Sequence, residues 1–243
     1  MIQIETTGGA IPAYRADPAG EPRGGVLVIH EVWGLVEHIK DVADRFAAEG
    51  YLAVAPDILS SAGLPPDVGA ELQRLVQSTD ERERTEAQPR LRDALSVTRS
   101  PEYAEWAVTV LAQVVDYLAA QHGLDDRIAV VGFCFGGTYA YAVAAEETRV
   151  GAVVPFYGAA PEFATLSDIR GRVLAFCGEQ DERITGTVPA LRDAMAAAGV
   201  DFTAVVYPGT GHAFFNDTSP SRYAPHAAAD AWRRTLEFLA ADG

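Results

Sequence analysis

A cysteine lies in the middle of a glycine-rich hexapeptide, residues 132–137, which reads Gly-Phe-Cys-Phe-Gly-Gly. The apolar run 127–131 before it is typical of a buried strand, and residues 138–145 after it are typical of a helix. A strand, a sharp Gly-x-nucleophile-x-Gly turn and a helix form a nucleophile elbow, in which glycines let strand and helix pack closely. The turn also places the sulfur of Cys134 at a helix N-terminus, where the helix dipole favours the thiolate over the thiol.

A nucleophile in an elbow needs a base and an orienting acid, which follow it along the chain in the order acid, then histidine. Asp181 is the candidate acid, because it lies just past the end of a predicted strand. Its rivals in the same loop are two glutamates, Glu179 and Glu182. His212 is the candidate base, in a glycine-containing loop after the last predicted strand, whereas His226 falls at the start of the final predicted helix. The ordered set predicts a triad of Cys134, Asp181 and His212.

This triad predicts nucleophilic attack on an acyl carbonyl. His212 takes the thiol proton or stabilises the thiolate, and Asp181 fixes the tautomer of His212. The oxyanion that develops on the carbonyl needs N–H donors, and the candidates are the backbone N–H groups of Phe135 and Val32. A free cysteine has a pKa of about 8.5, so the thiol needs activation near neutral pH.

Apolar runs alternate with helical patterns along most of the chain. Strands are expected at residues 26–30, 51–55, 127–131, 150–154, 173–177 and 202–207. Helices are expected at residues 39–49, 106–118, 138–145, 188–198 and 224–240. This alternation predicts an α/β fold in which helices cover both faces of a parallel sheet.

Residues 58–103 do not fit the alternation, because they form a long polar segment that contains six arginines. The segment follows the carboxyl end of a predicted strand, which is the edge where sites form in α/β proteins. It is either a flap over the site or a solvated surface excursion, and the sequence favours neither interpretation.

Composition narrows the class of protein. The chain has 243 residues and a net charge of −15, which fits one globular domain and argues against nucleic acid or an anionic membrane as the main partner. No apolar stretch approaches the ~20 residues needed to span a bilayer. The first residues lack signal-peptide features and the two cysteines do not suggest a disulfide framework, so we expect a cytoplasmic protein, and a monomer. Metal-ligand and nucleotide-binding spacings are not found, so no cofactor is expected.

Taken together, these residues resemble the dienelactone hydrolase family, the carboxymethylenebutenolidases, over nearly the whole chain. The marks of the resemblance are His-Glu-Val-Trp-Gly at 30–34, Ala-Pro-Asp at 55–57, the elbow hexapeptide, Asp181 and Gly-His at 211–212. The resemblance implies a single α/β-hydrolase domain over residues 1–243, with a mostly parallel central sheet. It also implies a cysteine-nucleophile hydrolase that cleaves lactones or activated esters through an acyl-enzyme.

The family resemblance gives Glu31 a role, because in these enzymes a glutamate at this position contacts the resting thiol and helps to make the thiolate once substrate binds. The family acts on an enol lactone that bears a carboxylate, and arginines hold that carboxylate. One of them lies in an Asp-Glu-Arg-x-Arg run, which matches residues 80–84 and makes Arg84 the candidate anchor.

Two positions depart from the family pattern. A tyrosine expected after the anchor arginine is Gln88, and a second arginine expected after the histidine is Asn216. The site is therefore less cationic, and a less acidic, bulkier or more apolar ester or lactone becomes plausible. The aromatic side chains of Trp33 and Phe214 are expected to line such a pocket.

Two alternatives to a dienelactone-cleaving enzyme stay open. The first is an esterase or thioesterase of the same mechanism with a different substrate, which the asparagine at position 216 favours. The second is a non-catalytic protein that uses Cys134 as a redox switch, although such a sensor would not need an ordered aspartate and histidine.

Overall fold

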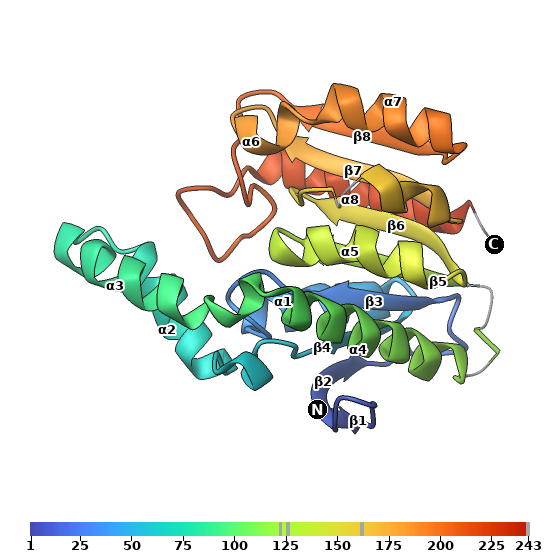
Figure 1. Ribbon diagram of the computed structural model, residues 1–243, viewed down its shortest axis with the longest axis horizontal. Coiled ribbons are helices and arrows are strands. Elements are labelled where there is room, and N and C mark those ends of the chain that lie inside the picture. Colours follow the sequence, from blue (N-terminus) through green and yellow to red (C-terminus); the bar gives the residue numbers. More distant parts are fainter. Residues whose placement is uncertain (122, 125–126, 161–162, 242–243) are drawn as a thin grey trace.

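The computed structural model describes residues 1–121, 123–124, 127–160 and 163–241. Within this part of the chain, eight strands form one sheet in the spatial order β1-β2-β4-β3-β5-β6-β7-β8 (Figure 1). The strands are β1 (Ile2–Ile4), β2 (Ile11–Ala16), β3 (Gly25–Ile29), β4 (Leu52–Pro56), β5 (Ile128–Phe133), β6 (Val150–Phe156), β7 (Arg172–Gly178) and β8 (Phe202–Tyr207). The α-helices are α1 (Glu37–Ala48), α2 (Pro66–Val76), α3 (Glu81–Ala94), α4 (Pro101–Ala119), α5 (Phe135–Glu146), α6 (Glu182–Thr185), α7 (Val188–Ala198) and α8 (Pro225–Ala240).

The sheet is mostly parallel, which confirms the predicted fold class. Strands β3 to β8 pair in parallel with their neighbours, while β1 and β2 add an antiparallel edge that the sequence did not predict. Parallel strands end at the same edge of a sheet, so the loops that follow β3, β5, β6, β7 and β8 lie together. Among the described helices, none is long and apolar enough to cross a membrane.

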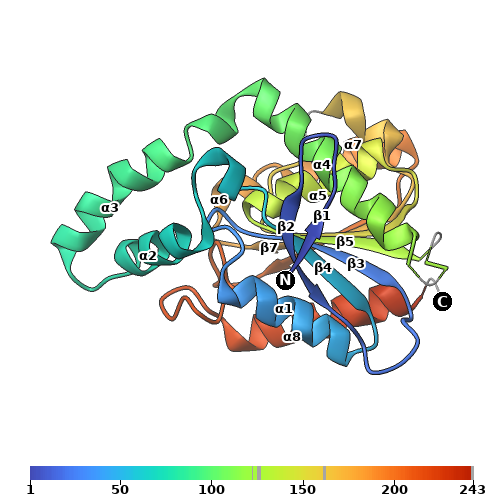
Figure 2. The same cartoon turned by 90° about the horizontal axis from the view of Figure 1, so that it is seen from below.

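Helices cover both faces of the sheet, as the unbroken apolar runs predict. In β3, Leu27 and Ile29 pack in the same cluster as residues of α4, α5 and α7, whereas Val26 and Val28 pack with α1 and α8. Successive strand side chains point to opposite faces, so a strand apolar at every position needs cover on both sides. Figure 2 shows α1 and α8 on one side of the sheet and α4, α5 and α7 on the other.

The polar segment after β4 contains α2 and α3, which pack against each other and extend beyond the sheet (Figures 1 and 2). Helix α2 lies close to the loop after β3, because a Cβ atom on Gly69 would be 1.9 Å from the carbonyl oxygen of Trp33. Within the 14 residues of α3, only Ala87 is buried. Helix α2 therefore packs on a loop at the carboxyl edge of the sheet, and helix α3 is largely solvated. Closure of this segment over a site stays a prediction.

The predicted elbow lies between β5 and α5, and direct backbone contacts hold it. A Cβ atom on Gly132 would be 2.0 Å from the carbonyl oxygen of Gly136, and one on Gly136 would be 2.2 Å from that of Ile29. Cys134 itself has φ of +55°, a left-handed conformation that costs a non-glycine residue about 1–3 kcal/mol. The rest of the turn must compensate for this strain, and any side chain at the two glycines would push the elbow away from β3.

We expect Gly136→Ala to lower the free energy of unfolding by about 3 kcal/mol or more, because the new methyl group meets backbone atoms that cannot rotate away. Gly151→Ala is the matched control, since the nearest atom to its new Cβ would be 3.9 Å away. Urea unfolding followed by circular dichroism measures both. Equal stability of the two variants would contradict the close packing of the elbow.

Candidate active site

Cys134, His212 and Asp181 come from three different strand ends and meet at the carboxyl edge of the sheet. His212 Nε2 lies 3.0 Å from Cys134 Sγ, and His212 Nδ1 lies 2.5 Å from Asp181 Oδ2. A carboxylate can only accept, so Nδ1 carries the ring proton and Nε2 is the acceptor that faces the thiol. The structure thus brings together the three residues that the sequence singled out, in the geometry of a nucleophile, a base and an orienting acid.

The loops that carry the acid and the base are joined through their backbones. A Cβ atom on Gly178, at the end of β7, would be 2.4 Å from the carbonyl oxygen of Gly211. The N–H of Gln180 donates to the carbonyl of Thr210 at 2.8 Å. These contacts fix one loop against the other, so the distance between the carboxylate and the imidazole does not depend on flexible side chains alone.

The two rival glutamates of the acid loop are placed differently from Asp181. The Glu179 carboxylate accepts from the N–H of Gly209 at 2.9 Å and so fastens the histidine loop. Glu182 is exposed at the start of α6. Among the described residues, Asp181 is the carboxylate that bonds to the ring of His212.

The elbow is also tied to its two neighbouring strands by hydrogen bonds. The N–H of Cys134 donates to Phe156 of β6 at 2.9 Å, and the N–H of Gly136 donates to the carbonyl of His30 at 3.1 Å. The N–H of Phe135 contacts the thiol and lowers its pKa. In the described part of the chain, no backbone carbonyl accepts from the N–H of Val32. The N–H of Phe135 thus faces the sulfur, and the role of both N–H groups as oxyanion donors stays a prediction.

The surroundings of Cys134 favour the thiol over the thiolate. Burial raises its pKa to about 12, and the nearby charge of Glu31 adds to this effect, followed by that of Asp181. The N–H of Phe135 and the charge of Arg183 act in the opposite direction but do not compensate. The helix N-terminus acts in the predicted direction, because the N–H of Phe135 lowers the pKa of the thiol, but desolvation and the charge of Glu31 outweigh it.

Glu31 is buried, with 2% of its surface exposed, and two side chains donate to its carboxylate. The hydroxyl of Tyr157 donates to Oε1 at 3.3 Å, and the amide of Asn216 donates to Oε2 at 2.5 Å. A buried carboxylate needs such donors, because desolvating it without them is costly. The position that the resemblance assigns to a second arginine is thus occupied by an amide that binds Glu31.

Sequence reasoning missed Tyr157. Its ring lies 5.1 Å from the ring of His212, and its φ of +40° is unusual for a residue with a side chain. Burial raises the pKa of its hydroxyl well above the ordinary value, so it donates to Glu31 as a neutral phenol. The usable signal was its position, directly after β6 and next to the strand that carries the elbow.

Over the part of the chain that the structure describes, none of the three predicted substrate contacts is hydrogen-bonded to the triad. The guanidinium of Arg84 donates to the carbonyl of Ser78 at 2.7 Å, inside the polar segment. Among the described residues, no hydrogen bond or ion pair joins Arg84 to the triad. Trp33 is buried against the core, and Phe214 is fully buried with its ring 5.5 Å from that of Tyr157. Contacts of these three side chains with substrate stay predictions.

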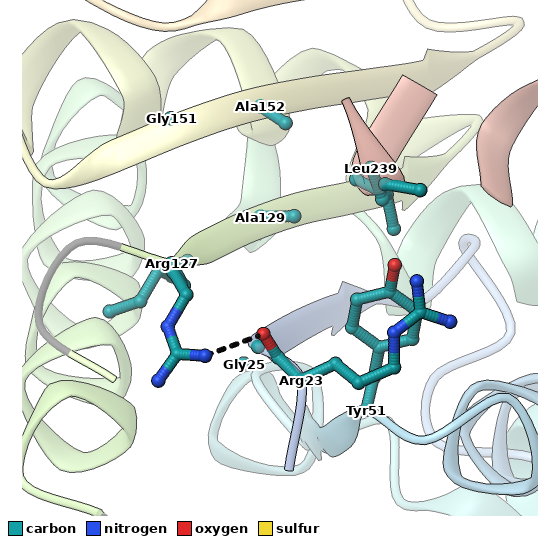
Figure 3. Close-up of a pocket in the computed structure, with 11 residues that line it drawn as sticks. Arg23, Gly25, Tyr51, Arg127, Ala129, Gly151, Ala152 and Leu239 are labelled. Carbon is teal, nitrogen blue, oxygen red and sulfur yellow. Dashed lines mark hydrogen bonds between the residues drawn. The ribbon is translucent and has the colours of Figure 1, made fainter. Parts of the chain in front are cut away.

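Two cavities lie at opposite edges of the sheet. One of about 500 Å³ adjoins His212 and is lined in part by Arg222 and Tyr223, from the segment before α8. The other, of about 650 Å³, lies where β3, β5 and β6 begin, and Arg23 and Arg127 line it (Figure 3). Because the triad is at the carboxyl edge, the cavity beside His212 is the one that belongs to the candidate site.

A sequence model of the dienelactone hydrolase family matches residues 11–242. The chain belongs to the dienelactone hydrolase family. It is therefore a hydrolase with an α/β-hydrolase fold that acts on carboxylic ester bonds.

Individual relatives agree with this membership. A protein of Saccharolobus solfataricus named "Putative carboxymethylenebutenolidase" is 32% identical over 98% of this chain and 96% of its own length. The crystal structure of a "Putative Dienelactone Hydrolase" from Klebsiella pneumoniae superposes with a TM-score of 0.81 and 31% identity, covering 98% of this chain and 96% of that one. A "dienelactone hydrolase-like promiscuous phosphotriesterase" from metagenomic libraries has a TM-score of 0.75 and 25% identity, with the same coverage of 98% and 96%.

We expect Glu31→Gln to speed the alkylation of Cys134 by iodoacetamide at pH 8, because the charge of Glu31 raises the pKa of the thiol. The rate should rise about tenfold for each unit by which the pKa falls. Mass spectrometry of the peptide that contains Cys134 follows the reaction. The exposed Glu37→Gln is the control and should leave the rate unchanged. A Glu31→Gln rate equal to or below that of the wild type would contradict the electrostatic assignment.

Proposed function

We propose that this chain hydrolyses lactone or activated ester bonds through a Cys134–His212–Asp181 triad and an acyl-enzyme. The observation that supports the proposal most directly is the line of contacts from Asp181 to His212 at 2.5 Å and from His212 to the sulfur at 3.0 Å. A cysteine at the elbow of this family, with a base in reach and an acid behind it, is the arrangement that covalent acyl transfer needs.

In the first half of the reaction, the thiol proton passes to Nε2 of His212 and the sulfur attacks the carbonyl carbon. The carbonyl oxygen becomes an oxyanion, for which the N–H groups of Phe135 and Val32 are the proposed donors. The tetrahedral intermediate then collapses, the bond to the leaving oxygen breaks, and His212 returns the proton to that oxygen. The acyl group is now a thioester on Cys134.

In the second half, water attacks the thioester while His212 takes a proton from it. The carbon–sulfur bond breaks, the acid is released, and the proton returns to Cys134. Asp181 stabilises the imidazolium in both halves and keeps its Nε2 directed at the reacting atoms.

The charge of Glu31 couples thiolate formation to the presence of substrate. A thiol with a pKa raised to about 12 is a poor nucleophile at neutral pH, so the resting cysteine should react slowly. We propose that a bound substrate excludes water and presents its carbonyl carbon to the sulfur. Transfer of the thiol proton to His212 is then followed at once by attack on that carbon. A sulfur nucleophile suits esters with good leaving groups better than amides, whose nitrogen needs fuller protonation.

The two candidate hydrolase functions differ in the charge of the substrate. Asn216 is a neutral donor that is committed to Glu31, which favours an uncharged ester or thioester. A carboxylate-bearing lactone needs a cation elsewhere, and the candidates are Arg84 and Arg183. No hydrogen bond or ion pair within the described residues involves the guanidinium of Arg183, and its charge acts on the thiol. We propose a monomer that acts in the cytoplasm, where a thiol nucleophile stays reduced.

We expect Cys134→Ala to abolish turnover and to leave the fold intact. Cys177→Ala is the control, because Cys177 is buried in a small cluster with Ile184 and Val188 and should keep most of the activity. In the wild type, rapid quenching with an activated ester should trap an acyl group on the Cys134 peptide by mass spectrometry. More than a trace of turnover by Cys134→Ala would overturn the mechanism.

If an arginine anchors the carboxylate of the substrate, we expect its removal to lower kcat/KM for a charged substrate more than for an uncharged one. The value of kcat/KM is measured for dienelactone and for an uncharged ester of similar size, in the wild type, Arg84→Ala and Arg183→Ala. Loss of the anchor should lower the dienelactone value about tenfold or more, because a charge-assisted hydrogen bond contributes about 1.5–3 kcal/mol. The control Arg90→Ala removes a solvated arginine that pairs with Glu71. Equal effects on both substrates would remove that arginine from the site.

A further inference from the structure

Glu31 is the one group of the candidate site whose placement depends on a residue that departs from the family pattern. Its carboxylate is buried and close enough to the sulfur for its charge to raise the pKa of the thiol, and its shorter hydrogen bond comes from Asn216 at 2.5 Å. The longer one comes from Tyr157 at 3.3 Å. The amide of Asn216 is therefore the principal hydrogen-bond donor to the Glu31 carboxylate.

The orientation of that amide is determined by Thr218. The backbone N–H of Thr218 donates to Oδ1 of Asn216 at 3.0 Å, and the hydroxyl of Thr218 lies 2.7 Å from the same oxygen. A backbone N–H can only donate, so the atom that it meets must be the amide oxygen. The amide nitrogen of Asn216 then faces Glu31 with no alternative arrangement.

The hydroxyl of Thr218 is in turn bound by the polar segment. Gln73, which is buried on α2, donates through Nε2 to the Thr218 hydroxyl at 3.1 Å. That hydroxyl has one proton, which it gives to Asn216, and it accepts from Gln73. A continuous line of hydrogen bonds thus runs from α2 through Thr218 and Asn216 to the carboxylate beside Cys134.

We propose that Asn216, oriented by Thr218 and through it by Gln73 of α2, is the positioning residue that holds the ionised Glu31 carboxylate beside Cys134. An arginine at this position would neutralise the charge of Glu31, whereas an asparagine holds the carboxylate and leaves its charge undiminished. The packing position of α2 is therefore linked to the charge of Glu31, which raises the pKa of the Cys134 thiol. The inference rests on the proposed function only in taking Cys134 as the nucleophile.

The first test is a double-mutant cycle on the alkylation of Cys134 by iodoacetamide at pH 8, read on the Cys134 peptide by mass spectrometry. Asn216→Leu removes the donor at similar volume, so the Glu31 carboxylate is no longer held in place, and alkylation should become about tenfold faster. In the Glu31→Gln background, the same substitution should change nothing further. An unchanged rate in the single variant, or an equal acceleration in both backgrounds, would overturn the proposal.

Milder variants keep the proposal testable if Asn216→Leu does not fold. Thr218→Val removes the hydroxyl and should accelerate alkylation, while Thr218→Ser retains it and should behave as the wild type. Gln73→Ala should act in the same direction as Thr218→Val. Its matched control is Gln77→Ala, because Gln77 lines a surface cavity together with Gln73 and Thr218 but makes no hydrogen bond to Thr218 in the described structure. Identical rates for the valine and serine variants would contradict the line of contacts.

The alkylation tests are independent of turnover, so failure of this inference and failure of the proposed function are distinguishable. If Asn216 has only a structural role, its variants lose stability with no shift in the pH profile of alkylation, and turnover still requires Cys134. If Cys134 is not the nucleophile, the alkylation profile shifts as described but Cys134→Ala retains turnover.

Discussion

The carbonyl oxygens of Gly136 and Ile29 occupy the space that side chains would fill at the elbow, so backbone contact holds the turn that carries Cys134. A second contact of this kind joins Gly178 to Gly211, between the acid loop and the base loop. Both contacts depend on residues without a Cβ atom, and both lie at the carboxyl edge of the sheet. The geometry of the site therefore follows from how closely five backbone segments approach, and the chemical groups are set upon that frame.

The electrostatics of the site disfavour the thiolate of Cys134, which is the ion that the proposed mechanism needs. The thiol is desolvated and lies near Glu31 and Asp181, which together outweigh the N–H of Phe135 and the charge of Arg183. A protein can maintain such a buried carboxylate only where donors surround it, and Tyr157 and Asn216 provide them. The result is a cysteine whose surroundings favour the thiol, in contrast to cysteines whose thiolate is stabilised permanently.

The sequence predicted the parts of the fold and site that depend on local patterns. Helix α7 and strand β8 have the predicted bounds, and the triad followed from the order of three residues that each come after a strand. What it could not predict depends on contacts between distant segments. Tyr157 and Asn216 are 126 and 185 residues from Glu31, and the absence of an arginine at position 216 suggested a lost substrate contact, not a donor to a buried carboxylate. Strand β1 escaped detection because it has three residues, and β2 because its sequence, Ile-Pro-Ala-Tyr-Arg-Ala, mixes polar residues and a proline with apolar ones.

Helix α3 buries a single alanine, although it belongs to the same segment as α2, which packs against the loop of Trp33. Substitutions, insertions or a change of length in α3 would disturb few packed atoms and none of the backbone contacts at the elbow. In the segment after β4, α2 is therefore the half in which few changes fit, and α3 is the half that tolerates many. Changes in α3 can therefore accumulate while the backbone contacts at the elbow stay the same.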